Sequence, residues 1–387
     1  MKRKRVCFVT TLAKSYREFL LNLSYHLIES HNYDVTFMCS DDGKIGKVCG
    51  DYLHFIPINM KRGVGLDGPM VIWKMYKIFR KEKYDIVLYG TPNGSFYASI
   101  ASNLAGIKNR LYYNWGLRYQ GFTGWKRSLV KAMIKTICSN SSVIEVESYS
   151  ILECAIKDGL YKPEKASVIW NGSACGVDLK KFDYSKRREW RTQIREELEI
   201  PESTIVFGFA GRLNKDKGVN ELVEAFSGLN ESDDALLLLI GDYDDVGTTI
   251  TPENVDRIEN SKTIKHIGYT SNLEKYYAAL DVFCSLSYRE GFGLVVIEAA
   301  AMGAPAVVSN VPGQYDTIIE NKTGVLAEVK NVNSTREALQ FYINHPEKIK
   351  EYGKNAHEHV VANYDSVKLF DKLAEHRDQL IEQSYKS

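Results

Sequence analysis

Short runs rich in β-branched and aromatic residues alternate with longer amphipathic stretches along the chain, and this alternation constrains the fold most. In the first half, such runs predict strands at residues 5–10, 35–39, 85–89, 110–113, 143–146 and 167–170. Stretches with apolar residues at helical spacing lie at 17–30, 71–82 and 126–138. Strands that alternate with helices in this way predict a parallel sheet with helices on both faces.

The same pattern restarts after a polar, charged stretch at 178–202, which predicts a connection between domains. Strands are then expected at 205–210, 235–240, 264–267, 282–286, 306–309 and 324–326, and helices at 218–229, 273–280, 293–302 and beyond 335. With 387 residues the chain suits two domains. We therefore predict an α/β protein of two Rossmann-like, doubly wound domains, 1–177 and 178–365, which face each other across a cleft. The amphipathic stretch 366–387 is predicted to pack back on the first domain as a helix.

Composition and cysteine usage indicate a cytoplasmic globular protein. The chain is 44% hydrophobic and 26% charged, and it has no apolar run of the roughly 18 residues that a membrane span needs. A basic N-terminus precedes an apolar stretch, but Lys14 interrupts that stretch and no cleavage site follows, so we interpret it as a buried strand. The 7 cysteines form no CxxC pair and have no metal-like spacing with histidines. Neither a disulfide framework nor a zinc site is expected.

Charge is distributed unevenly along the sequence. Residues 1–175 carry 25 Lys and Arg against 14 Asp and Glu, whereas the remainder carries 25 against 35. The first half therefore has an excess of positive charge, which favours an anionic partner such as phospholipid headgroups, nucleic acid or a phosphorylated substrate. Solvated lysines without a partner are the alternative.

A glycine-rich loop with two cations follows the first strand of the second domain. Gly211 lets the backbone approach a ligand, and the following helix N-terminus favours negative charge. Arg212 offers a guanidinium fork and Lys217 an ammonium group at the carboxyl end of the strand, where open α/β sheets bind ligands. This combination predicts a diphosphate site. An ordinary basic surface loop remains the alternative, and a nicotinamide fingerprint is excluded because no G-x-G-x-x-G occurs here.

A second strand–turn–helix segment carries two glutamates. Glu290 precedes the turn Gly291-Phe292-Gly293, the following helix starts near Gly293, and Leu294 is counted among the donor-binding residues. The amides of the turn are expected to hold a second side of the diphosphate. Glu290 is placed to accept hydrogen bonds from sugar hydroxyls. Glu298, about one and a half turns into the helix, is placed to reach a ribose hydroxyl pair.

The pattern Gly211-Arg212-Leu213…Lys217-Gly218 followed by Glu290…Glu298 resembles the hallmark of retaining glycosyltransferases of the GT-B fold, family 4. This resemblance implies that Arg212 and Lys217 neutralise the diphosphate leaving group, that Glu290 contacts the donor sugar and that Glu298 binds ribose. It also implies a metal-independent enzyme, with no cofactor besides the sugar-nucleotide donor. The acidic stretch 242–245 is accordingly interpreted as a solvated or donor-proximal turn.

Two segments of the first half resemble capsular-polysaccharide glycosyltransferases of the CapM type. They are Trp115-Gly116-Leu117-Arg118-Tyr119 with the basic pair Lys126-Arg127, and Trp170-Asn171-Gly172 with its continuation to Phe182. The resemblance implies transfer from a UDP-sugar, an N-acetylated or deoxy hexose, to a polyprenyl-diphosphate-linked sugar at the inner membrane face. Arg118 is a candidate acceptor residue. Trp115 stands where many relatives have His, so an acceptor role of that His does not carry over.

Other candidates in the first half rest on position and charge. Lys14 and Ser15 follow the first strand and are candidate cleft residues, although a plain helix entry fits them equally well. On the stretch 71–83, Trp73 and Lys77 lie opposite an apolar stripe, and Arg127 and Lys131 begin a second basic row. Aromatic and basic residues together suit an anionic membrane surface. A solvated helix face is the alternative for each stripe.

Two other classes of protein share the predicted architecture. A sugar-nucleotide epimerase would bind a UDP-sugar and convert it without an acceptor. A non-catalytic subunit would bind the sugar nucleotide and turn nothing over, but the intact set of Arg212, Lys217, Glu290 and Glu298 argues against that. Nucleic acid is not expected as a partner, because the sequence has no recognisable nucleic-acid-binding module.

Overall fold

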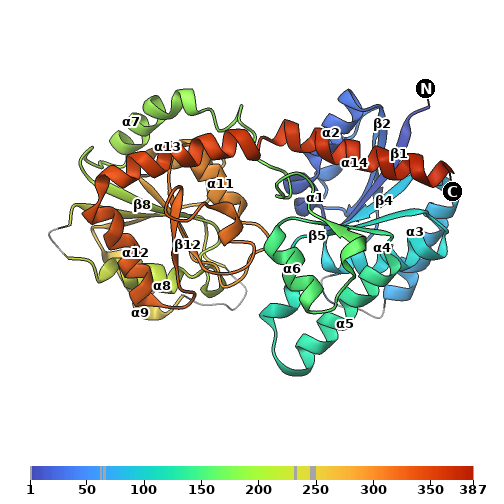
Figure 1. Cartoon of the computed structure of the whole chain (residues 1–387), viewed down its shortest axis with the longest axis horizontal. Coiled ribbons are helices and arrows are strands. Elements are labelled where there is room, and N and C mark those ends of the chain that lie inside the picture. The colour runs from blue at the N-terminus through green and yellow to red at the C-terminus, as the bar shows by residue number, and fades with distance from the viewer. Residues whose placement is uncertain (1, 62, 64–66, 231–232, 245–249, 387) are drawn as a thin grey trace. The chain divides into compact units, whose positions relative to one another are not determined.

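The computed structural model describes residues 2–61, 63, 67–230, 233–244 and 250–386. The chain divides into two compact units, Met1–Cys175 with Val367–Ser387, and Gly176–Ser366 (Figure 1). The first boundary lies slightly before the predicted residue 177, because the backbone N–H of Val177 bonds to the carbonyl of Tyr364 in the second unit. None of the helices in the described ranges combines the length and the apolar content that crossing a bilayer demands.

Among the described residues, the first unit forms a seven-stranded sheet of parallel strands in the order β3-β2-β1-β4-β5-β6-β7. The strands are β1 (Lys4–Leu12), β2 (Tyr33–Ser40), β3 (Leu53–Pro57), β4 (Ile86–Tyr89), β5 (Asn109–Asn114), β6 (Val143–Val146) and β7 (Ala166–Ser167). Strand β3 was not among the predicted strands. It is a short edge strand with a mostly half-exposed pattern, which gives a weak sequence signal.

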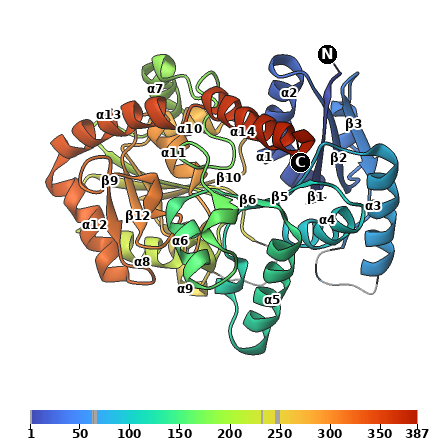
Figure 2. The same cartoon turned by 45° about the vertical axis from the view of Figure 1, so that its right-hand side comes forward.

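Helices cover both faces of this sheet (Figure 2). They are α1 (Ala13–Phe19), α2 (Leu21–Ser30), α3 (Gly68–Glu82), α4 (Pro92–Leu104), α5 (Gly124–Asn140), α6 (Tyr149–Lys157) and α14 (Ser366–Lys386). Residues of α1, α2 and α14 share one apolar cluster with the sheet, and residues of α3 to α6 share the other. The predicted helix 17–30 is interrupted at Leu20, where the backbone leaves helical geometry. The apolar stripe predicted on 71–83 is confirmed, since Val71, Met75 and Phe79 are buried.

The C-terminal helix α14 returns to the first unit and lies beside α2 (Figures 1 and 2). Its apolar residues Leu369, Phe370 and Leu373 join the α1 and α2 cluster. Arg377 of the same helix donates to the Glu145 carboxylate of β6 at 2.9 Å, and their side chains are only 0% and 1% exposed. A buried ion pair thus anchors α14 to the sheet.

Among the described residues, the second unit forms a six-stranded parallel sheet in the order β10-β9-β8-β11-β12-β13. The strands are β8 (Ile205–Ala210), β9 (Ala235–Ile240), β10 (Ile264–Gly268), β11 (Val282–Ser285), β12 (Ala306–Ser309) and β13 (Gly324–Ala327). The helices are α7 (Arg187–Glu197), α8 (Val219–Ser227), α9 (Pro252–Asn260), α10 (Leu273–Ala279), α11 (Leu294–Ala301), α12 (Val332–Asn344) and α13 (Pro346–Asn363). Helices α8, α9 and α12 cover one face, and α7, α10, α11 and α13 the other.

The polar stretch 178–202 is not a connection between domains, so that part of the prediction is wrong. It contains α7, which packs on α10 within the second unit. Trp190 and Ile194 are buried on its inner face. Arg195 bonds to Asp281 at 2.6 Å and to the carbonyl of Thr204 at 3.0 Å. The stretch looks like a linker in sequence because its buried contacts include charged groups that find partners only in the folded unit.

Candidate active site

The strand order of the second unit reverses between β8 and β11. From β8 the chain builds β9 and β10 on one side, and it then returns to place β11 on the other. The helices that follow two such strands leave on opposite faces, so their loops open a crevice at the carboxyl edge of the sheet. The β8–α8 loop carries Arg212 and Lys217, and the β11–α11 loop carries Glu290. The fold therefore brings both predicted phosphate-binding loops to the switch point.

The β8–α8 loop is held in shape by its own side chains and by a glycine. The side chain of Asn214 accepts a hydrogen bond from the Lys217 backbone N–H at 3.0 Å and closes a single helical turn. Gly218 has a φ of +70°, and a Cβ there would lie 2.2 Å from the carbonyl oxygen of Leu286 in the other loop. The backbone N–H of Tyr288 also bonds to the carbonyl of Asp216 at 2.9 Å. The two loops thus pack directly against each other.

The β11–α11 loop is buried and supported from behind. Phe292 is buried, and its ring lies 5.4 Å from that of Tyr364, so this residue packs in the core. Gly313 of the loop after β12 would place a Cβ 2.5 Å from the carbonyl of Glu290, which leaves room only for glycine. Gly291 and Gly293 are buried, and Leu294 is half-buried at the start of α11. These contacts fix the backbone that the sequence predicts to face a diphosphate.

The two central charges of the predicted site are in contact. The Lys217 ammonium forms an ion pair with Oε1 of Glu290, and the Ser287 hydroxyl donates to the same oxygen at 3.0 Å. Both charged side chains are partly buried. Lys217 is therefore held beside the second loop by a carboxylate, and its ammonium has further donors available for a phosphate oxygen.

Arg212 lies in the same loop but has a different partner. Its guanidinium donates to Oδ2 of Asp244 at 2.7 Å, and Asn214 donates to the same oxygen at 2.9 Å. The Arg212 side chain is largely exposed. The turn after β9, predicted to be solvated or donor-proximal, thus holds Arg212 through Asp244, and Asp242 accepts from the backbone of Tyr269. Asp245 lies outside the described residues.

Glu298 is a partly buried residue one turn into α11. Burial raises its pKa to about 7, with Lys181 opposing and Glu274 adding to that increase. Lys181 lies 3.9 Å from the Glu274 carboxylate, so the two glutamates share one nearby cation. A carboxylate in such surroundings gains most from two hydroxyl donors, which is what a ribose offers.

The pKa of Glu298 predicts a pH dependence of nucleotide binding. The ionised carboxylate can accept a hydrogen bond from each of two ribose hydroxyls, whereas the protonated form accepts fewer. At the ribose site that the sequence predicts, nucleotide affinity should therefore fall as the pH drops below about 7. In Glu298→Gln this dependence should disappear, apart from the titration of the nucleotide's own phosphate. Calorimetric titrations at several pH values between 6 and 8 compare the two proteins. If the variant keeps the pH profile of the wild type, Glu298 does not bind the ribose.

The candidate residues of the first unit each have their own local surroundings. Lys14 forms an exposed i,i+4 pair with Glu18 at 3.6 Å, Ser15 is half-buried in α1, and Arg118 is exposed in the turn Arg118–Gly121. The first unit has its own switch point between β1 and β4. There the Thr11 backbone N–H donates to the Thr91 hydroxyl at 2.7 Å, and Gly94 donates to the Thr11 hydroxyl at 3.0 Å. The sequence Gly90-Thr91-Pro92-Asn93-Gly94 after a strand was the signal that could have identified this loop.

Trp115 is built into the same edge of the first sheet. A Cβ on Gly90 would lie 2.8 Å from the Trp115 ring, and Phe19 lies 5.0 Å from that ring. The indole therefore occupies space at the carboxyl ends of β4 and β5. This explains why Gly90 is required there.

The predicted membrane-facing residues differ in their surroundings. Trp73 is 54% exposed, and the Lys77 ammonium lies 3.6 Å from its ring centroid. Arg127 and Lys131 instead face the ring of Tyr119, and Lys131 pairs with Asp158 at 3.6 Å. Sequence reasoning missed the more exposed apolar residues: Trp125 is 72% exposed, and Met70 and Leu129 are also exposed.

Two protein-family descriptions match most of the chain. "Glycosyl transferase 4-like" matches residues 5–148 and "Glycosyl transferases group 1" matches residues 191–359. A capsular polysaccharide biosynthesis glycosyltransferase, CapM of Staphylococcus aureus, is 27% identical over 96% of both chains. A UDP-Gal:alpha-D-GlcNAc-diphosphoundecaprenol alpha-1,3-galactosyltransferase of Escherichia coli is 26% identical over 90% of both chains.

Solved structures share the fold over nearly the whole length. HepE of Anabaena, crystallised with UDP and glucose, superposes with a TM-score of 0.78 at 17% identity over 97% of this chain and 99% of that one. At this identity the likeness concerns the fold. The two family matches establish that this chain belongs to the glycosyltransferases, with a glycosyl transferase 4-like domain followed by a glycosyl transferases group 1 domain, and the superposition shows the GT-B fold that they share.

Proposed function

We propose that this enzyme transfers a sugar, with retention of configuration, from a UDP-sugar to a polyprenyl-diphosphate-linked sugar acceptor in capsular, O-antigen or exopolysaccharide assembly. The observation that carries the proposal is the Lys217–Glu290 ion pair at the switch point of the second unit. In this pair, a cation that would neutralise a leaving diphosphate lies beside a carboxylate that would orient the donor sugar. The donor class is supported by the HepE structure with UDP and glucose, and the acceptor class by the Escherichia coli relative.

In the proposed reaction, the bond between the anomeric carbon and the diphosphate breaks, and an acceptor hydroxyl forms the new glycosidic bond. The proton of that hydroxyl passes to an oxygen of the departing diphosphate. Negative charge grows on the departing UDP, so Lys217, Arg212 and the amides of Gly291 to Gly293 act where the transition state needs donors. Glu290 orients the donor sugar through its hydroxyls and does not attack it. Attack from the same face on a short-lived ion pair then retains the configuration. No metal or cofactor has a role in this proposal.

The function is tested with purified protein, a panel of UDP-sugars and a synthetic polyprenyl-diphosphate-linked sugar. The panel includes N-acetylated and deoxy hexoses, which we propose as donors, and non-acetylated hexoses for comparison. The expected result is a glycolipid product whose new linkage keeps the anomeric configuration of the donor, as determined by NMR. An inverted linkage would contradict the proposed mechanism, and turnover only with a water-soluble acceptor would contradict the acceptor class.

The same assay separates the alternatives. An epimerase would convert the UDP-sugar in the absence of any acceptor, which chromatography of the nucleotide sugars detects. A non-catalytic subunit would bind UDP and leave both substrates unchanged. The proposed transferase consumes donor in proportion to the glycolipid formed.

The first unit is proposed to bind the inner face of the cell membrane from the cytoplasm. Helices α3 and α5 both pack against α4, and their exposed aromatic residues Trp73 and Trp125 each lie near a lysine ammonium. Indole rings with neighbouring cations suit the interface of an anionic bilayer. The positive excess of residues 1–175 adds attraction that does not depend on one contact.

We expect Trp73→Ser/Trp125→Ser to reduce binding to vesicles that contain anionic lipid by at least about tenfold. Burying one large apolar side chain contributes about 1.5–3 kcal/mol, so loss of two exposed indoles outweighs any single cation. Vesicle co-sedimentation measures the change. Ile319→Ser, which removes an exposed apolar residue of the second unit, is the matched control and should bind as the wild type does. Equal vesicle binding by all three proteins would show that the surface around Trp73 and Trp125 does not bind the membrane.

A further inference from the structure

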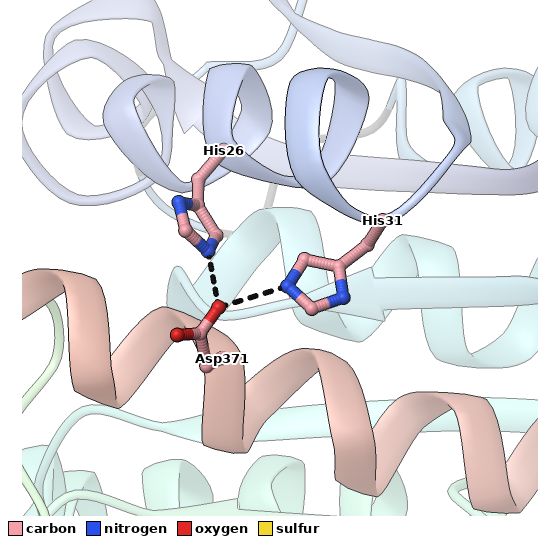
Figure 3. A group of neighbouring side chains, drawn as sticks. All are labelled: His26, His31 and Asp371. Atoms are coloured by element: carbon pink, nitrogen blue, oxygen red, sulfur yellow. Dashed lines mark hydrogen bonds and ion pairs between the residues drawn. The ribbon is translucent and has the colours of Figure 1, made fainter.

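Two histidines and an aspartate converge in the first unit, away from the residues discussed above. The imidazoles of His26 and His31 both direct Nε2 at the same carboxylate oxygen of Asp371, at 2.7 and 2.9 Å (Figure 3). His26 lies in α2, His31 directly follows that helix, and Asp371 lies in α14. The three ligand atoms lie within 4.8 Å of one another.

The surroundings hold the three side chains in place. Both imidazoles are largely buried, and their ring centroids are 5.2 Å apart. Phe370, next to Asp371 in the chain, packs 5.7 Å from the His26 ring. Because the rings are already packed, little freedom remains to be lost when a ligand binds between them. Asp371 is half-exposed, so the group is accessible from solvent.

The spacing is close to that of a metal centre. A divalent transition metal binds imidazole nitrogen at about 2.0–2.1 Å and carboxylate oxygen at about 2.0–2.2 Å, which places tetrahedral ligand atoms about 3.4 Å apart. The two Nε2–Oδ1 distances, 2.7 and 2.9 Å, need to widen by about 0.5–0.7 Å to reach that value. The end of α2 contributes the negative end of a helix dipole, which favours a cation at His31.

We propose that His26, His31 and Asp371 bind a divalent transition metal of the zinc class, with water completing the coordination. Imidazole nitrogen with one carboxylate suits Zn²⁺, Ni²⁺ and Cu²⁺ better than Mg²⁺ or Ca²⁺. The metal links His26 of α2 to Asp371 of α14, which are 345 residues apart in the chain, and so stabilises the packing of α14 on the first unit. It adds to the neighbouring contact in which Lys4 pairs with Asp378 of α14.

This proposal is independent of catalysis. The site lies within the first unit, and the residues proposed to bind UDP lie in the second. The expected consequence is a more stable first unit. A sugar-transfer reaction that needs no metal is compatible with it.

The test uses the full-length chain without an affinity tag, freed of metal with a chelator and titrated with ZnSO₄ by calorimetry. We expect one equivalent of Zn²⁺ to bind, and the midpoint of thermal unfolding to rise by about 5 °C or more when Zn²⁺ exceeds its Kd about a hundredfold. Asp371→Asn and His31→Ala should each weaken binding more than tenfold. His54→Ala removes a histidine that pairs with Asp34, outside the proposed metal site, and it should leave Zn²⁺ binding unchanged.

The metal-binding test remains decisive even if one of the variants folds poorly. Circular dichroism identifies such a variant, and Co²⁺ added to the wild-type protein should then give the visible absorption of a protein-bound, low-coordinate site. Failure of the wild type to bind Zn²⁺ or Co²⁺ with one-to-one stoichiometry would overturn the proposal, and so would binding that Asp371→Asn and His31→Ala leave intact. In either case the three residues form a hydrogen-bonded contact only.

Discussion

Replacing Lys217 by alanine is expected to lower kcat for sugar transfer by about 10²–10³-fold while leaving the fold intact. One donor aimed at charge that develops in the transition state contributes on this scale. The partly buried ammonium lies beside Glu290 in a loop shaped by backbone contacts, so its removal leaves the loop's backbone hydrogen bonds in place. Initial-rate kinetics with the UDP-sugar measures the effect, and circular dichroism verifies the fold.

Lys215 provides the matched control for this variant. It lies in the same single turn, Lys215–Lys217, and is exposed, so Lys215→Ala removes an equal charge from the same loop. We expect Lys215→Ala to keep close to full activity. If the two alanine variants lose activity equally, the loss would come from the reduced positive charge of the loop and not from the position of the Lys217 ammonium.

Glu290→Ala tests the other member of the pair and is also expected to lower kcat strongly while leaving a measurable residual rate. Because Lys217 and Glu290 contact each other, their effects should not add, and the double variant should be little slower than the worse single variant. Fully additive losses would show that the two residues act separately.

Arg377→Met is expected to destabilise the first unit by about 3–5 kcal/mol. The substitution leaves the Glu145 carboxylate buried without its arginine partner, and an uncompensated buried charge costs this much. Burial alone would raise the pKa of Glu145, but Arg377 and His376 outweigh burial and lower it. The pair therefore stabilises the unit above the ordinary carboxyl pKa, and this contribution is lost as the pH falls.

The double variant Glu145→Met/Arg377→Met separates the buried charge from lost packing. Replacing both partners of a buried pair by apolar residues is often neutral or stabilising. Within the described residues, Nε and Nη1 of Arg377 also lack hydrogen-bond partners, so the double variant removes two unsatisfied donors. We expect it to recover most of the stability in urea unfolding monitored by hydrogen exchange in the first unit. A double variant as unstable as the single one would contradict this explanation.

The core of the candidate site was predictable because it depends on strand order. Lys217 and Glu290 are 73 residues apart, yet both follow strands that end at one edge of the sheet. Each strand–loop–helix segment has a local signature in its glycines and in the apolar run before it. The rule that ligands bind where the strand order reverses then places the two loops together.

Other parts of the molecule depend on tertiary contacts that no local pattern encodes. The sequence of α7 resembled a polar linker, because its buried Arg195 finds its partner Asp281 only after folding. The partner of Arg212, Asp244, lies in a turn that was interpreted from sequence only as solvated or donor-proximal. The contact of Asp371 with His26 and His31 joins distant helices, so neither the cysteine pattern nor the spacing of the histidines indicated a metal ligand set.

The central claim, that the loop around Lys217 binds the diphosphate of a UDP-sugar, is tested most directly by comparing UDP with uridine. Calorimetry gives the affinity of each ligand for the wild type and for Lys217→Ala. We predict that the wild type prefers UDP over uridine by at least about a hundredfold, and that Lys217→Ala loses most of this preference while binding uridine as before. If the ratio of the affinity for UDP to the affinity for uridine is the same in both proteins, the assignment of the site is contradicted.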